Sequence, residues 1–271
     1  MASSDLSPGT DGHGAPDARV MLAAASGFSV GAGDYERGRP SYPADAVELL
    51  CRELGIGPGA TVLDLAAGTG KLTRLLVPTG AEVVAVEPVA EMRALLEAST
   101  PTVDVRDGTA EHLPLAGASV DAVTVAQAFH WFDAEVALRE IARVLRPGGG
   151  LGLIWNERDT REPWVAELSR LIRWDQRGEW QVPYTVEDDW VARIEALDVP
   201  FGAVSRHDTT YRQRMDVDTL VARVLSTSYI ASQPPEARSS LAAEVRALVA
   251  DVAEPFDLPY VTVVYWCRRN P

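Results

Sequence analysis

The sequence is poor in cysteine and in basic residues, and it has no long apolar run. Its two cysteines, Cys51 and Cys267, lie far apart and show no metal-ligand spacing, which favours a reducing compartment over a disulfide-based fold. No stretch approaches the roughly 18 consecutive apolar residues of a membrane-spanning helix. With 25 Lys and Arg against 39 Asp and Glu, the formal net charge is −14, which disfavours non-specific binding to nucleic acid or anionic lipid.

These absences lead us to expect a cytoplasmic protein without a nucleic-acid or membrane partner. Residues 1–19 are rich in Ser, Gly, Asp and Pro and lack the basic start and apolar core of a signal peptide, so we expect a disordered leader. Residues 20–271 have a length typical of one large domain, and 46% of all residues are hydrophobic, which is enough for a core. The sequence leaves the oligomeric state open.

Apolar strands alternate with helical patterns through the first part of the chain. The expected strands are 61–66, 82–87, 102–106, 120–127 and 151–155, with helices at 71–77, 89–99 and 133–145. Repeated βα units of this kind predict a parallel sheet with helices on both faces and ligands beyond the carboxyl ends of the strands. With two further strands at 201–214 and 260–267, we expect an α/β, Rossmann-like, seven-stranded, mostly parallel sheet.

The pattern changes after residue 157, where helical patterns replace the alternation. Five of the seven Trp residues fall between 155 and 190, and residues 157–200 are expected to form a helical insertion after the fifth strand. Such an insertion is well placed to cover a substrate and to wall an acceptor pocket. Packing in the core is the alternative for these aromatic residues. Arg158 and Arg161 are both candidates to hold an acidic acceptor.

The stretch 61–71, Thr-Val-Leu-Asp-Leu-Ala-Ala-Gly-Thr-Gly-Lys, is the strongest local signal. A strand gives way to Gly68 and Gly70 and then to a helix, an arrangement that lets the backbone approach a ligand and presents free N–H groups. A dinucleotide fingerprint would have a third glycine, which is missing here. Instead, Asp64 lies inside the strand and Glu87 closes the next strand, where a carboxylate can accept bonds from both ribose hydroxyls.

Five motifs occur in order and together carry a family resemblance. They are Asp64–Gly70, Val86-Glu87-Pro88 with Met92, Gly108–Pro114, Val120–Gln127 and Leu145–Gly149. The series resembles the class I S-adenosylmethionine-dependent methyltransferases. Within that superfamily, residues 35–43 and 127–133 resemble the small-molecule branch that includes trans-aconitate methyltransferase-like proteins.

The resemblance implies roles for individual residues. The first-motif loop would hold the methionine part of the cofactor, Glu87 the ribose, and Pro88 and Met92 the adenine. Thr109 stands where the family usually has Asp, so its hydroxyl or the Ala110 backbone would take over the adenine bond. The cofactor-binding residues expected on this basis are Tyr35, Arg39, Asp64, Ala66, Gly68, Gly70, Glu87, Pro88, Met92, Thr109, Ala110 and Gln127.

Within this set, Arg39 is a partner for the methionine carboxylate, and Gln127 would stand beside the sulfonium methyl with Ala128 and His130. Tyr35 could fold over the ligand, although a simple helix entry explains both Tyr35 and Arg39 equally well. No metal is expected.

Methyl transfer from a sulfonium is an in-line displacement in which the protein chiefly orients the reactants. A general base is needed only if the acceptor must lose a proton. His130 is the candidate base because it follows the fourth strand and because the unperturbed pKa of a histidine is near neutral. The alternative is that His130 packs at the start of helix 133–145, which Asp133 would cap.

We therefore expect methyl transfer from S-adenosylmethionine to a small-molecule acceptor, with oxygen slightly favoured over nitrogen or carbon. One alternative is a methyltransferase acting on nucleic acid or protein. The acidic balance argues against it, as does the sequence after the fourth strand, Gln127-Ala-Phe-His130 in place of Asn/Asp-Pro-Pro-aromatic. A non-catalytic cofactor-binding regulator is another alternative, and a dehydrogenase is weakened by the missing glycine.

Overall fold

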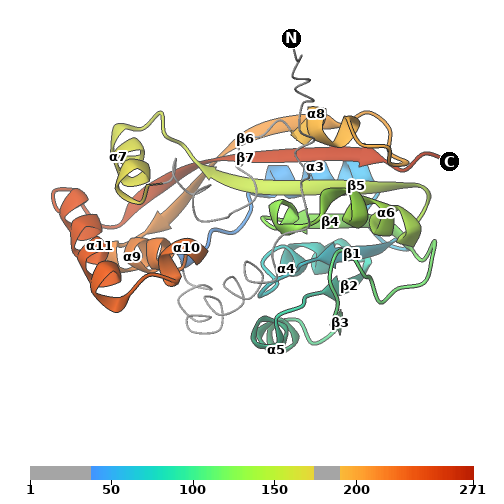
Figure 1. Cartoon of the computed structure of the whole chain (residues 1–271), viewed down its shortest axis with the longest axis horizontal. Coiled ribbons are helices and arrows are strands. Elements are labelled where there is room, and N and C mark those ends of the chain that lie inside the picture. The colour runs from blue at the N-terminus through green and yellow to red at the C-terminus, as the bar shows by residue number, and fades with distance from the viewer. Residues whose placement is uncertain (1–37, 174–189) are drawn as a thin grey trace, which may run out of the picture.

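The computed structural model describes residues 38–173 and 190–271. One sheet of seven strands, in the order β3-β2-β1-β4-β5-β7-β6, runs through this part of the chain and carries helices on its faces and at one end (Figure 1). The expected leader, Tyr35 and the middle of the expected insertion lie outside the described residues.

The strands are β1 (Thr61–Leu65), β2 (Glu82–Val86), β3 (Asp104–Arg106), β4 (Val120–Ala126), β5 (Leu145–Arg158), β6 (Ser205–Met215) and β7 (Phe256–Arg268). The α-helices are α3 (Ala44–Leu54), α4 (Thr73–Leu76), α5 (Ala90–Ser99), α6 (Ala134–Val144), α7 (Pro163–Leu171), α8 (Trp190–Glu195), α9 (Val217–Leu225), α10 (Ser228–Ala231) and α11 (Pro235–Leu248). Two short 3₁₀ helices are η1 (Val77–Thr79) and η2 (Phe129–Trp131).

The sheet is mixed, because β7 runs antiparallel to both of its neighbours. β1 to β5 pair in parallel, as the βα alternation predicts. β7 pairs antiparallel with β5 and with β6. The reason lies in the connection: β6 ends at Met215 and β7 starts at Phe256, opposite Met215 in register, so the chain leaves and re-enters the sheet at the same end. Strand number and the mostly parallel core are confirmed, whereas the apolar pattern of β7 carries no information on its direction.

Each face of the sheet has its own core, which follows from the two-residue period of a strand. In β1, Leu63 and Leu65 belong to the core under α6, whereas Val62 belongs to the core under α3. Asp64 alternates with Leu63 and Leu65 and therefore faces the same side as Val62. The expected helix N-cap is also present, since the Asp133 carboxylate accepts a hydrogen bond from Val136 N at 3.3 Å.

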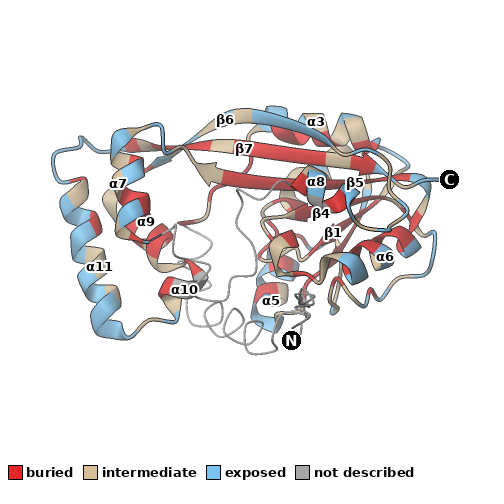
Figure 2. Cartoon of the chain, turned by 45° about the horizontal axis from the view of Figure 1, so that its top comes forward, coloured by how far each residue is buried: buried red, intermediate tan, exposed pale blue. Residues whose placement is uncertain are grey.

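A third core holds together a group of helices beyond the carboxyl end of β5. We call this group the helical lobe: it consists of α7, α9, α10 and α11 and lies at the left in Figure 1. Its buried side chains include Leu168 of α7, Leu220 of α9 and Val245 of α11, and they pack with Leu258 of β7. Figure 2 shows the buried side of these helices turned inward and their outer faces exposed.

The two described helices of segment 157–200 go to different places. α7 belongs to the helical lobe, where Leu168 is buried. α8 packs on the sheet, with Trp190 stacked on Trp155 at 5.6 Å between ring centroids and in edge contact with Phe129 at 5.2 Å. Core packing therefore explains Trp155 and Trp190, and the substrate-covering role of this segment stays a prediction. No helix in the described ranges is both long and apolar enough to cross a membrane.

Candidate functional site

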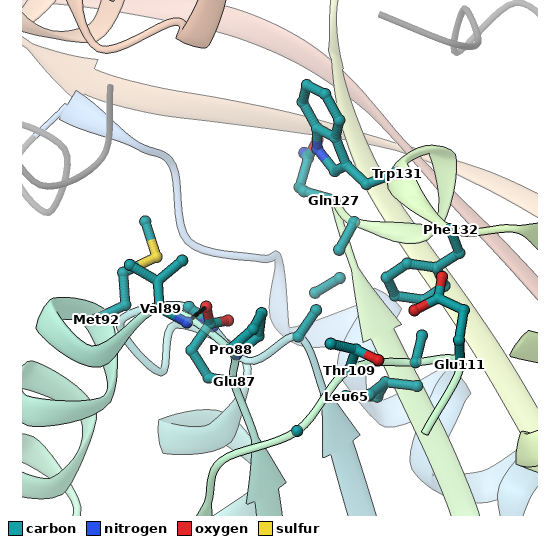
Figure 3. A pocket seen from close by; sticks show the side chains of 16 residues that line it. Leu65, Glu87, Pro88, Val89, Met92, Thr109, Glu111, Gln127, Trp131 and Phe132 are labelled. Carbon is teal, nitrogen blue, oxygen red and sulfur yellow. Dashed lines mark hydrogen bonds between the residues drawn. The ribbon is translucent and has the colours of Figure 1, made fainter. Parts of the chain in front are cut away.

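A pocket lies at the carboxyl ends of β1, β2 and β4, where open α/β sheets bind their ligands. It encloses about 800 Å³ of empty space, including a part open to solvent. The described residues that line it are Leu65, Ala66, Gly68, Glu87, Pro88, Val89, Met92, Gly108, Thr109, Ala110, Glu111, Ala126, Gln127, Ala128, Trp131 and Phe132 (Figure 3).

The two glycines of the first loop serve different purposes. Gly68 lines the pocket with φ +58°, and a Cβ there would meet only the Met92 sulfur at 3.8 Å. Gly70 has φ +86°, and a Cβ there would lie 2.4 Å from Cδ1 of Leu96 on α5. Gly70 is therefore needed for the close packing of the loop on α5 and is absent from the described lining, whereas Gly68 keeps the backbone open to a ligand.

Glu87 is a buried carboxylate that backbone hydrogen bonds hold in place in the wall of the pocket. The residue is 4% exposed, and its carboxylate accepts hydrogen bonds from Gly68 N at 2.8 Å and from Val89 N at 2.9 Å. Burial raises the pKa of this carboxyl, and the two backbone N–H groups partly oppose the rise. Each oxygen keeps a further acceptor position. A carboxylate held in this way can receive two ribose hydroxyls.

Asp64 lies behind the pocket and does not line its described wall. Thr73 of α4 donates its hydroxyl to Oδ2 at 2.6 Å, and Thr124 of β4 donates to Oδ1 at 3.2 Å. Full burial raises the pKa of Asp64 to about 6, against the lowering effect of both hydroxyls. In this position the carboxylate ties β1 to β4 and α4. Its contact with a cofactor ammonium group stays a prediction.

Two lining residues have backbone conformations that non-glycine residues rarely adopt. Ala66, just after β1, has φ +54°, and Gln127, just after β4, has φ +59°. Such residues cost about 1–3 kcal/mol each and persist only where neighbours hold them. For Gln127, its N donates to Ile154 O at 2.9 Å and its Nε2 to Asn156 O at 3.3 Å. Strain at two strand ends that line one pocket indicates a functional site.

The loop after β3 forms another part of the pocket wall. Thr109, Ala110 and Glu111 all line the pocket, as expected for the first two. Glu111 accepts a hydrogen bond from Asp133 N at 3.1 Å through Oε1. The carboxylate thus fastens this loop to the start of α6. The predicted hydrogen bond between the adenine amino group and Thr109 or Ala110 stays a prediction.

Sequence reasoning missed the aromatic side of the pocket. Figure 3 shows Met92 and Val89 on one side and Trp131 and Phe132 on the other. A signal was present, because both aromatic residues follow the fourth strand at its carboxyl end. His130, between Phe129 and Trp131 on η2, is half-buried with its ring 5.0 Å from that of Trp131 and is absent from the described lining. Its role as a general base stays a prediction.

Arg39 is held at the helical lobe. Its Nη2 donates to Ser226 O at the end of α9, at 3.3 Å, and it does not belong to the described lining of the pocket. The expected pairing of Arg39 with a methionine carboxylate therefore stays a prediction.

The ionisable groups in the described lining are the carboxylates Glu87 and Glu111, and that lining holds no Lys, Arg or His. A pyrophosphate needs cations or a helix N-terminus against it, and two carboxylates oppose it. The same charges favour a ligand with positive groups. With its acceptors for hydroxyls, its apolar floor and its aromatic side, the pocket suits a cationic nucleoside.

Comparison with known proteins gives concordant results. The family model described as "Methyltransferase domain" matches residues 63–153. An uncharacterized methyltransferase of Mycobacterium tuberculosis is 44% identical over 252 residues, which are 90% of this chain and 96% of the relative. An uncharacterized methyltransferase of Schizosaccharomyces pombe is 33% identical over 250 residues, 90% of this chain and 97% of the relative.

Among solved structures, a protein of Anaeromyxobacter dehalogenans that is named, provisionally, a Type II methyltransferase shares the fold. Its TM-score is 0.59 at 24% identity, with 86% of this chain and 97% of the other covered.

Proposed function

The chain belongs to the class I methyltransferases, and from this premise we propose that it transfers a methyl group from S-adenosylmethionine to a small-molecule acceptor. Membership rests on full-length relatives that carry the methyltransferase name. The narrower resemblance to the trans-aconitate methyltransferase-like branch, which rests on residues 35–43 and 127–133, is part of the proposal. So is action in the cytoplasm without nucleic-acid or membrane partners, for which the net charge of −14 is the support.

The observation that carries the cofactor assignment is Glu87 in an acidic, partly apolar pocket. Its carboxylate is fixed by Gly68 and Val89 and faces a cavity whose other described ionisable group is also a carboxylate. S-adenosylmethionine has two ribose hydroxyls, a positive sulfonium and a positive ammonium. NAD has the ribose hydroxyls and adds two phosphate charges, which this lining would repel.

The residues present fit the cofactor. Glu87 would hold the ribose, and Pro88, Met92, Thr109 and Ala110 would surround the adenine. Ala66, Gly68 and Gln127 would hold the methionine part, because their backbones lie at the ends of β1 and β4. When bound, the cofactor supplies an activated methyl group on a sulfonium leaving group.

What the chain contributes to the reaction is orientation. A rigid pocket, with two strained strand ends and a fixed carboxylate, holds one reactant in place and lets the second approach along a single line. We favour an oxygen acceptor, because a deprotonated oxygen needs no general base and the described lining holds no His. If the acceptor must lose a proton, His130 is the nearest candidate along the chain, one residue before the lining Trp131.

Ligand-induced stabilisation tests the cofactor assignment. S-adenosylhomocysteine, at about 100 times its Kd, should raise Tm by roughly 5–10 °C, and NAD at the same concentration should not. Glu87→Ala should weaken S-adenosylhomocysteine binding by roughly 10²–10⁴-fold, since two hydrogen bonds to a charged group are lost.

Glu91→Ala is the matched control, because Glu91 is exposed in the first turn of α5 and next to Met92. Its affinity for S-adenosylhomocysteine should stay within twofold of the parent. Stabilisation by NAD alone, or full affinity in Glu87→Ala, would overturn the assignment.

A further inference from the structure

Arg223 is a buried cation on α9 of the helical lobe, and within the described part of the chain it has no carboxylate partner. The residue is only 6% exposed. Its Nη1 donates to Thr227 Oγ1 at 3.5 Å, the long limit of a hydrogen bond, and its Nε has no acceptor among the residues that the structure describes. Burying a guanidinium without a compensating anion is costly, so this arrangement calls for an explanation.

A second guanidinium reaches the same end of α9. Arg39 donates through Nη2 to Ser226 O at 3.3 Å, and the Ser226 hydroxyl in turn donates to Arg223 O at 2.9 Å. Gly38 packs so closely on the helix that a Cβ there would lie 2.7 Å from Arg223 Cα. The segment after residue 38, blue in Figure 1 and beside α10 at its start, therefore brings Arg39 to the helix end that carries Arg223.

A short chain of hydrogen bonds connects this place with the cofactor pocket. Gln127, which lines the pocket, donates from Nε2 to Asn156 O at 3.3 Å. Asn156 donates from Nδ2 to Ser41 O at 2.8 Å. From Ser41 to Arg39 is a span of two residues, which is at most about 7 Å of chain. The end of α9 and the methionine end of the pocket are thus tied together through residues 39–41.

We propose that Arg223, assisted by Arg39, binds an oxyanion group of the methyl acceptor at the C-terminal end of α9. The inference rests on the proposed function and deepens it, because it names the chemistry of the acceptor. Arginine suits the role, since its planar fork binds carboxylate or phosphate oxygens in pairs. The chain's acidic balance repels anions in general, so an anionic acceptor needs such a local cation.

The alternative ligand for Arg223 is the carboxylate of the cofactor. The described lining of the cofactor pocket ends at Phe132 and includes no residue of the helical lobe. Arg223 therefore belongs to a different subsite, and the acceptor is the reactant left to occupy it.

The test measures anion binding in the presence of saturating S-adenosylhomocysteine, with inorganic phosphate and succinate as probes and chloride to hold ionic strength. Calorimetric titration of the parent should show binding of at least one probe. Arg223→Met should weaken that binding roughly tenfold or more, because a hydrogen-bonded charge is lost. Arg170→Met is the matched control on α7, with a side chain 71% exposed, and should bind as the parent does.

Folding does not confound the comparison, because replacing an unpartnered buried charge by a side chain of similar length should leave the apo Tm unchanged or raise it. Arg223→Lys keeps the charge without the planar fork and should show an intermediate affinity. Phosphate as the better probe identifies a phosphorylated acceptor, and succinate a carboxylic acid; either result supports the proposal.

Three results would overturn it: no binding of either probe to the parent, equal binding to Arg223→Met, or an equal loss of S-adenosylhomocysteine affinity in that variant. The last would assign Arg223 to the cofactor carboxylate. If the parent binds no S-adenosylhomocysteine but binds a probe through Arg223, the methyltransferase cofactor assignment fails and the anion site stands.

Discussion

The pocket at the ends of β1, β2 and β4 and the helical lobe hold their charged groups in opposite ways. In the pocket, Glu87 is held by two backbone N–H groups and Glu111 by one. In the lobe, the side chain of Arg223 makes one hydrogen bond with the described residues, at 3.5 Å. A fixed charge is ready before its ligand arrives, which lowers the cost of binding. An unsatisfied charge gains most of its stabilisation from the ligand, which favours selectivity for a partner of the right sign.

The two regions also differ in how far apart their parts lie in the sequence. The described pocket wall comes from residues 65–132, at the ends of neighbouring parallel strands. The core of the helical lobe combines residues 165–172 with residues 215–260, and the arginines at the end of α9 come from residues 39 and 223. The lobe and the pocket also belong to separate hydrophobic clusters.

The largest effect expected from this separation is on stability. Leu220→Ala in the lobe should lower the free energy of unfolding by about 2–5 kcal/mol, because Leu220 is fully buried, and should leave S-adenosylhomocysteine affinity unchanged. Leu65→Ala is the matched variant in the pocket wall, where Leu65 is 1% exposed; it should lose stability and affinity together. Urea unfolding and calorimetry measure both quantities. Equal losses of affinity in the two variants would mean that the regions are not independent.

The pocket is the more predictable region, because its residues belong to short sequence motifs that occur in a fixed order along the chain. Gly68 and Glu87 were identified from a glycine turn and a carboxylate at a strand end, and the structure joins them by a hydrogen bond. Asp64 was placed in the same motif, but strand alternation turns it toward α4 and Thr124. In the register of β1 and β4, Asp64 lies opposite Thr124. The sequence of β1 alone does not predict this pairing, because it depends on the register between the two strands.

For the helical lobe, the sequence indicates helical patterns after residue 157 but no site at Arg223. The helical spacing of Val217, Leu220, Val221 and Val224 matches one face of α9, and Arg223 lies beside that apolar stripe. Whether a residue beside a stripe is buried depends on what packs against the helix, here the segment at Gly38. That segment is 185 residues away in the sequence, so periodicity alone carries no signal of the contact.

A second variant tests how tightly the pocket's glycine loop is built. Gly70→Ala should cost roughly 2–4 kcal/mol of unfolding free energy, the sum of a positive φ and overpacking, because its Cβ would lie 2.4 Å from Leu96 Cδ1. Gly55→Ala is the matched control: its φ is +70° and nothing lies within 4 Å, so it should show the backbone cost alone. Chemical denaturation gives both values. Equal costs would mean that the loop has room against α5.

A third variant tests the charge buried behind the pocket. The folded-state pKa of Asp64 is raised to about 6, above the ordinary value near 4. The ionised form is therefore disfavoured in the native state, and stability that is present below pH 4 is lost as the pH rises through 6. Asp64→Asn should remove this loss, so that its unfolding free energy rises relative to the parent by about 2–3 kcal/mol between pH 4 and pH 7.

Urea unfolding of the apo proteins at several pH values in that range measures this difference. The carboxyls with lowered pKa, Asp121, Glu140 and Asp159 among them, are common to both proteins and cancel in the comparison. Thr73 and Thr124 can donate to or accept from the new amide, so the hydrogen bonds are kept. A difference that does not change with pH would show that Asp64 titrates normally in the folded chain.

The smallest expected effect concerns backbone strain, which both regions contain. Gln127 in the pocket has φ +59° and Arg173, just after α7, has φ +51°. Glycine relieves such a φ and alanine does not, so Gln127→Gly should be more stable than Gln127→Ala by about 1 kcal/mol. Arg173→Gly and Arg173→Ala should differ by a similar amount.

The Gln127 variants and the Arg173 variants should differ in their affinity for S-adenosylhomocysteine. Both Gln127 variants lose the bond to Asn156 that holds this part of the pocket wall in place. The cost of ordering the wall again, about one neutral hydrogen bond, should weaken S-adenosylhomocysteine binding by roughly threefold to tenfold. Both Arg173 variants should bind as the parent does, since Arg173 lies in the lobe. If instead the Arg173 variants weaken S-adenosylhomocysteine binding as much as the Gln127 variants do, strain in the lobe is transmitted to the pocket. The two regions would then act as one unit.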